Sequence, residues 1–181
     1  MRFQQSIGVI NLARLFDRPT LLPSAFYKCA LLGSDVLDGY KREDRSVEHL
    51  SLEDVKRCMN GRNKLVQEAF TIILEVFIPR PCNGCTSAAV CQTALQQLLE
   101  VAMESCRQAS ASVLQGWDDV IHKCAQESHL CALCQKEVLE REYKARKRVW
   151  NALPGIFHIK MDGWPSDANG GDEGDGAAPT A

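Results

Sequence analysis

Apolar side chains recur along the chain at three- and four-residue intervals, the spacing that places them on one face of an α-helix. No run alternates between apolar and polar residues as a half-buried strand would. We therefore predict an all-α fold, an irregular bundle of about six helices. The expected helices cover residues 8–17, 20–32, 51–78, 86–106, 113–124 and 131–150.

The segment from Ser51 to Ile78 is predicted to be a long central helix. The Ser51 hydroxyl can accept an amide hydrogen bond at its start while Asp54 reaches back, which completes a capping box. Residues 69–77 are apolar on nearly all sides, so this half of the helix should lie centrally in the fold. Pro79 ends the helix, which at this length would extend about 40 Å.

Proline and glycine mark where other elements end. Arg18-Pro19 separates the first two helices, because the residue before a proline is pushed out of the helical region. Residues 38–49 are polar and charged, and we expect a surface loop there. Residues 153–155 (Leu-Pro-Gly) are expected to end the last helix, after which Ile156 and Phe157 return to the core.

The composition changes at Asp162. The last twenty residues contain five acidic residues and five glycines. Such a segment cannot bury enough apolar surface to offset the entropy lost on ordering. We predict one helical domain over residues 1–161, followed by a disordered acidic Gly-rich tail over residues 162–181. A total of 181 residues suits a single domain with a tail.

The net charge and the number of cysteines indicate which partners and which cellular compartment to expect. The net charge of −2 gives no reason to expect attraction to nucleic acid or to an anionic membrane. The longest apolar run, residues 69–78, is far shorter than the roughly 18 residues that span a membrane. Nine cysteines without a visible secretion signal favour a reducing compartment. We expect an intracellular protein of the cytoplasm or nucleus that does not contact membranes.

Five of the nine cysteines form two groups. Cys82, Cys85 and Cys91 lie within ten residues, and Cys131 and Cys134 follow about forty residues later. Zinc is bound by four thiolate or imidazole groups in a tetrahedron, and two cysteines separated by two residues can reach one ion. Cys131 also stands at the head of a predicted helix, whose positive end favours thiolate. By spacing alone, Cys82 and Cys85 would be the partner pair, since the glycine between them suits a tight turn.

Other roles for these cysteines stay open. Free cysteine is among the most buried residue types, so all of them could be core side chains, and disulfides are a third possibility. The gap of about forty residues is long for a zinc ribbon. A zinc ion held by four protein ligands would be structural, because no position remains for water. The remaining cysteines fall on apolar faces of predicted helices and are expected in the core: Cys29, Cys58, Cys106 and Cys124.

The most basic stretch, Arg141–Arg148, suggests an alternative function. A helix that contacts nucleic acid would carry such a run. Acidic residues interrupt it, and pairs four residues apart, Glu140 with Lys144 and Glu142 with Arg146, instead favour a solvated helix face. Nucleic acid is therefore the disfavoured partner.

No motif points to catalysis. The chain has no phosphate-binding glycine loop, no nucleophile elbow and no recognisable pair of catalytic carboxylates. Redox chemistry at a C-x2-C pair expects a βαβ setting, which the helical pattern excludes. A thiol enzyme would need a base beside its cysteine, and His122 and His129 precede Cys131 only in sequence. We predict that the protein is not an enzyme.

Five segments, taken in order, resemble one family. The combination is similar to fungal BTB/POZ-domain proteins of mushroom-forming species, in which such helices follow an N-terminal BTB domain that forms dimers. The BTB fold itself is missing here, so the chain resembles the C-terminal helical half and BTB-dependent dimerisation is not carried over. The segments are ARLFDRPTLLPSAFYKC (13–29), HLSLEDVKRCMNGRNKL (49–65), CTSAAVC (85–91), LCALC (130–134) and VWNALPGIFHIKMDGW (149–164).

The resemblance implies a protein–protein interaction or adaptor role. The family pattern C-T-S-x3-C also implies Cys85 and Cys91 as the partner pair, in place of Cys82. The working surface would be a groove between helices or the exposed flank of the 51–78 helix, and its protein partner is not named by the sequence. The predicted zinc ligands are Cys85, Cys91, Cys131 and Cys134, with Cys82, His122 and His129 in reserve.

Overall fold

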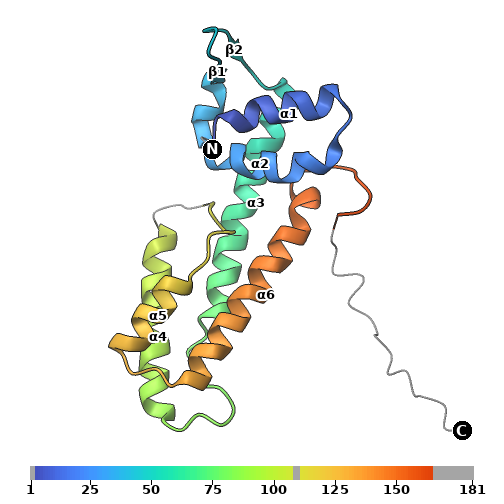
Figure 1. The fold of residues 1–181 in the computed structure, drawn as a ribbon. Coiled ribbons are helices and arrows are strands. Elements are labelled where there is room, and N and C mark those ends of the chain that lie inside the picture. Colours follow the sequence, from blue (N-terminus) through green and yellow to red (C-terminus); the bar gives the residue numbers. More distant parts are fainter. Residues whose placement is uncertain (1–2, 108–110, 165–181) are drawn as a thin grey trace, which may run out of the picture.

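The computed structural model describes residues 3–107 and 111–164, and these are mostly helical. The long helices α3 and α6 lie side by side and run in opposite directions (Figure 1). Helices α1 and α2 cover one end of this pair, and α4 and α5 pack along the other. The predicted all-α irregular bundle with a long helix is confirmed. In chain order the elements are α1 (Gln5–Leu15), η1 (Pro19–Leu21), α2 (Leu22–Leu31), η2 (Gly33–Asp38), β1 (Tyr40–Lys41), β2 (Val47–Glu48), α3 (Leu52–Val76), α4 (Ala88–Arg107), α5 (Asp118–Glu127) and α6 (Ala132–Ile156).

The start of α3 is tied to α1 by a buried carboxylate. The Ser51 hydroxyl accepts a hydrogen bond from the Asp54 amide at 3.1 Å, which confirms the predicted helix cap. The Asp54 carboxylate was expected to complete a capping box, but it pairs with two arginines. It accepts hydrogen bonds from Arg14 of α1 and from Arg57, each at 2.9 Å. Two cations therefore compensate the cost of burying this charge.

The second half of α3 is central on one side only. Ile72, Ile73 and Val76 are buried, as predicted. Phe70 is 44% exposed and Leu74 is 62% exposed, so the expectation that this half would be covered all round was wrong. Phe70 and Leu74 are exposed because they lie on a flank of α3 that its neighbours α4 and α6 do not cover.

Helix α6 continues past its predicted end and through Pro154. Proline has no amide to donate to the carbonyl four residues earlier, which belongs to Trp150. The indole Nε1 of Trp164 donates to that carbonyl at 3.1 Å, and the two tryptophan rings lie with centroids 5.0 Å apart. Trp164 thus packs against α6, although it falls in the segment expected to be a tail. The rest of that segment, residues 165–181, lies outside the described residues.

Two further details differ from the sequence-based expectation. The helix expected from residue 113 begins only at Asp118. The segment before it is fixed by the Trp117 amide, which donates to the buried carboxylate of Glu142 at 3.3 Å. Within residues 38–49, the expected loop contains the short hairpin of β1 and β2.

In the described residues, no helix has both the length and the apolar character needed to cross a membrane.

The junction of α2, α3 and α6 depends on a glycine. Phe157 follows α6, is fully buried and stacks on Phe26 of α2 with ring centroids 5.6 Å apart. Its ring lies directly against Gly61 of α3, where an added methyl group would overlap the ring. Close packing tolerates such overlap poorly, so only glycine allows Phe157 to occupy this place.

We predict that Gly61→Ala lowers the free energy of unfolding by about 1–3 kcal/mol, because the cost of overpacking exceeds the gain in helix propensity. The matched control is Gly155→Ala in α6, where no atom lies within 4 Å of the added carbon. That change should leave stability equal or raise it by up to about 1 kcal/mol. Denaturant unfolding followed by circular dichroism measures both, and equal effects of the two variants would contradict the packing argument.

Candidate metal centre

Four thiols from two distant parts of the sequence meet at one end of the molecule, at the bottom in Figure 1. Cys85 lies in the α3–α4 loop and Cys91 in the first turn of α4, while Cys131 caps α6 and Cys134 lies in its first turn. Their sulfur atoms all lie within 4.8 Å of one another, and those of Cys85 and Cys131 are 3.8 Å apart. A zinc ion with Zn–S bonds of about 2.3 Å places its sulfurs about 3.8 Å apart, so the four thiols form a cluster of the right size.

Two helices begin at this cluster. The N-terminal ends of α4 and α6 carry partial positive charge and unpaired amides, both of which stabilise a nearby thiolate. Three amides donate to cluster sulfurs. The amide of Cys134 donates to Cys131 Sγ at 3.5 Å, that of Cys131 to Cys91 Sγ at 3.4 Å, and that of Cys82 to Cys134 Sγ at 3.3 Å. Hydrogen bonds of this kind orient the ligating side chains in metal sites, so these three amides would hold the sulfurs in place for a metal.

The cluster thiols differ in acidity. The amide of Cys134 lowers the pKa of Cys131 to about 7, and the neighbouring thiols add to this effect. Burial raises the pKa of Cys91 and of Cys134. One thiol of the four is therefore ready to ionise near neutral pH, and a metal ion would displace the protons from the others.

The three reserve ligands do not join the four-thiol cluster. Cys82 is the nearest: its sulfur lies 3.4 Å from that of Cys134. His122 is exposed on α5, where its Nδ1 lies 2.7 Å from the carbonyl oxygen of Asp118. His129 is exposed as well. The structure thus brings together the four cysteines chosen from the resemblance, with Cys82 beside them.

The other cysteines behave mostly as core residues. Cys29 and Cys58 are fully buried, as expected, and the adjacent Cys29 thiol together with burial raises the pKa of Cys58. Cys124 is half-buried, and the side chain of Cys106 lies outside the described residues. All eight cysteines whose side chains are described are free thiols.

Ion pairs account for most of the charge on the basic stretch of α6. The two pairs predicted within the helix are present, Glu140 with Lys144 at 2.7 Å and Glu142 with Arg146 at 2.9 Å. Glu142 is nevertheless buried, and burial raises its pKa, so this pair is not the solvated one expected. Arg148 crosses to α3, where it binds two carboxylates. The further pairs are Arg141 with Glu137, and Arg148 with Glu68 and Glu75.

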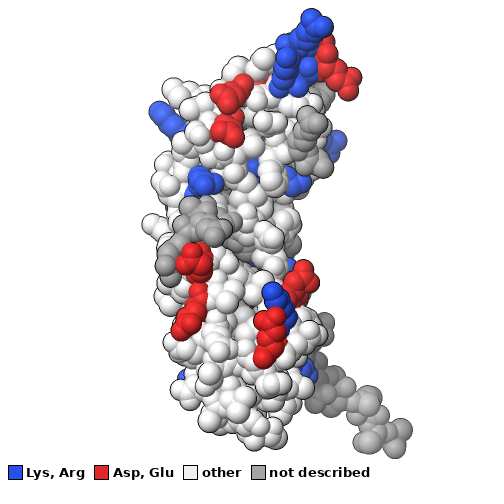
Figure 2. Space-filling view, turned by 90° about the vertical axis from the view of Figure 1, so that its left-hand side faces the viewer, with Lys and Arg blue, Asp and Glu red and all other residues white. Residues whose placement is uncertain are grey.

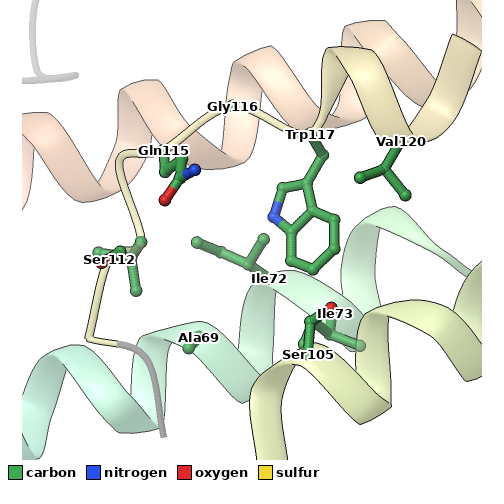
Figure 3. A pocket seen from close by; sticks show the side chains of 10 residues that line it. Ala69, Ile72, Ile73, Ser105, Ser112, Gln115, Gly116, Trp117 and Val120 are labelled. Carbon is green, nitrogen blue, oxygen red and sulfur yellow. The ribbon is translucent and has the colours of Figure 1, made fainter. Parts of the chain in front are cut away.

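A cavity of about 250 Å³ lies between α3 and the segment that leads into α5 (Figure 3). Trp117 and Val120 point into it from one side and Ile72 from the other. Serine and glutamine side chains and the indole N–H of Trp117 are the polar groups among the described residues that line it, with no acid, histidine or cysteine among them. The cavity therefore offers apolar volume without a general acid or base.

Comparisons with protein-family models, with curated proteins and with solved structures found no match to this chain. The similarity to fungal BTB/POZ-domain proteins stays an expectation from sequence.

Cys131 should be the first cluster thiol to react in reduced, metal-free protein. Thiolate is the reactive form, so alkylation by iodoacetamide should reach half its maximal rate near pH 7, where Cys131 ionises. Peptide mapping over a pH series gives the rate for each cysteine. Cys124→Ser should leave this fast reaction intact, and Cys131→Ser should remove it. A fast reaction at another cysteine, or a midpoint near the ordinary thiol pKa of about 8.5, would contradict the proposed acidity.

Proposed function

We propose that this chain is a non-enzymatic helical interaction domain, one end of which is held together by a structural zinc ion. The observation that carries the proposal is the four-thiol cluster. Four protein thiolates complete a tetrahedral zinc site and leave no position for water or substrate, so such a site stabilises a fold and does not catalyse.

The position of the cluster fits a structural role. It connects the α3–α4 loop and the start of α4 to the start of α6, and α5 packs between α4 and α6. A metal bound here would close a loop of the chain between Cys91 and Cys131. Closing such a loop lowers the conformational entropy of the unfolded chain, and the free energy of metal binding becomes folding free energy.

Exposed apolar side chains support an interaction role. Leu12, Leu15 and Phe16 share one face of α1 at helical spacing, and Leu15 is 73% exposed. On α3, the flank expected to be a working surface presents Phe70 and Leu74. Charged side chains are sparse and scattered over much of the surface seen in Figure 2. Clustered exposed apolar groups are typical of protein contact sites.

The alternative, contact with nucleic acid through Arg141–Arg148, has less support. Arg141, Lys144, Arg146 and Arg148 are each paired with an acidic side chain of the same helix or of α3. A phosphate backbone would have to displace these carboxylates before it could gain the cations.

Protein purified without chelator should contain about one zinc ion per chain. Its four cluster thiols, in addition to the buried core thiols Cys29 and Cys58, should be protected from a colorimetric thiol reagent until the protein is denatured. Cys131→Ser removes one ligand and should abolish both the zinc and the protection of the other three thiols. Cys124→Ser is the matched control, because Cys124 is a half-buried cysteine outside the cluster, and should change neither.

The outcome that would overturn the zinc site is metal-free wild-type protein with unprotected thiols, even after zinc is added during refolding under reducing conditions. The cluster cysteines would then be core packing residues. Iron in place of zinc, seen by elemental analysis and visible absorption, would replace the metal in the proposal, since four thiolates also suit iron–sulfur centres.

The interaction role predicts that the apolar face of α1 binds protein. Leu15→Ser combined with Phe16→Ser removes two exposed side chains without opening the core. Binding to proteins that co-purify from native cells should fall on the order of tenfold, because losing exposed anchor residues costs about 1–3 kcal/mol. Quantitative mass spectrometry measures the change, and Val101→Ser, at an exposed position of α4 outside the cluster, is the control.

Equal recovery of the same proteins with all three forms would rule out this face as the contact. Gel shifts with labelled DNA and RNA at about 150 mM salt test the alternative in the same preparations. The interaction proposal expects no shift. A salt-sensitive shift that is lost in Lys144→Ala together with Lys147→Ala would favour the nucleic-acid function instead.

A further inference from the structure

A fifth thiol, that of Cys82, lies beside the four-thiol cluster, although a tetrahedral metal needs only four ligands. Cys82 lies outside the group of four mutually close sulfurs, yet its Sγ is 3.4 Å from Cys134 Sγ and its amide donates to the same sulfur at 3.3 Å. Cys82 is half-buried, whereas Cys134 is buried. A fifth, half-buried thiol is thus held against one buried ligand of the proposed site.

We propose that Cys82 is a resolving thiol that makes the metal site sensitive to peroxide. Oxidation would join Cys82 to Cys134 in a disulfide, which withdraws one of the four ligands and releases the metal. This inference rests on the proposed structural zinc site and adds its regulation.

The reaction balances with hydrogen peroxide as the oxidant. Peroxide reacts first with Cys82, the half-buried thiol beside the cluster that would not be a metal ligand; the thiol becomes a sulfenic acid, and one water leaves. The Cys134 thiolate then attacks the sulfenic sulfur, the S–S bond forms, the S–O bond breaks and hydroxide departs. In total, one thiol, one thiolate and one peroxide give one disulfide, one water and one hydroxide, and the two sulfurs together lose two electrons.

The geometry requires little movement. The two sulfurs must approach from 3.4 Å to about 2.05 Å. Cys134 is fixed in the first turn of α6, but Cys82 lies in the α3–α4 loop. Nearby, Gly84 has a φ of +83°, and a carbon added at its Cβ position would meet no neighbour within 4 Å, so this part of the loop has room to move.

The pairing is selective for Cys82 when metal is bound. Cys85 and Cys131 are also close, at 3.8 Å, but a metal ion would hold both as ligands. Cys124, the half-buried cysteine of α5, lies outside the cluster; its thiol contacts the carbonyl oxygen of Ala94 at 3.7 Å and the hydroxyl of Ser128 at 3.9 Å. Cys82 is therefore the thiol in contact with the cluster that would remain free to react.

Zinc-loaded, reduced protein treated with hydrogen peroxide in the presence of a colorimetric zinc indicator tests the inference. Wild type and Cys124→Ser should release zinc at the same rate. Cys82→Ser should release it on the order of tenfold more slowly, because the neighbouring thiol acts at a high effective concentration. Mass spectrometry of the oxidised wild type should show a Cys82–Cys134 linked peptide, and thiol reductant with added zinc should restore the metal.

Each contrary outcome has a distinct meaning. Equal release rates in wild type and Cys82→Ser, or a mapped Cys85–Cys131 disulfide, would overturn the inference and leave the zinc site standing. A lower zinc content in reduced Cys82→Ser would make Cys82 a ligand, which also overturns it. If wild-type protein binds no zinc, the proposed zinc site is overturned, and so is this inference, because there is no metal for oxidation to release.

Discussion

The antiparallel packing of α3 against α6 is the contact on which the remaining elements depend. Valine, leucine and isoleucine side chains fill the seam, and Arg148 of α6 reaches Glu68 and Glu75 of α3 across it. At one end, the fit of Phe157 against Gly61 fixes where α6 finishes and gives α2 a ring to pack on. At the other end, the buried Phe77 follows α3 and packs edge-on against Trp117 with ring centroids 5.4 Å apart, and the cysteine cluster also lies there.

Different interactions hold the two ends together. The end with α1 and α2 buries large side chains and a carboxylate compensated by two arginines. The α4–α5 end buries Phe77 against Trp117, and the segment before α5 is held in part by one hydrogen bond from the Trp117 amide to Glu142. The proposed metal cross-link between the starts of α4 and α6 would add to this packing, as metals and disulfides do in small domains.

Local patterns predicted most of the fold, because helical spacing and helix caps are properties of adjacent residues. The start of α3 at Ser51 and the buried faces of α3 and α6 follow from such patterns. Features that depend on distant residues were not predictable. Glu142 is buried because the Trp117 amide reaches it, and Cys82 touches Cys134 although 52 residues separate them. The choice of Cys85 and Cys91 over Cys82 came from the resemblance, since spacing alone favoured another pair.

The contact between Pro154 and Trp164 links two positions that have no obvious relation in sequence. A proline in the last turn of a helix leaves a carbonyl without its amide, and an indole ten residues later supplies the missing donor. Any other residue at 154 would restore the backbone bond and make the tryptophan dispensable for this purpose. The two residues should therefore change together in evolution. A chain that keeps the proline and loses the tryptophan would expose a carbonyl that only solvent could satisfy.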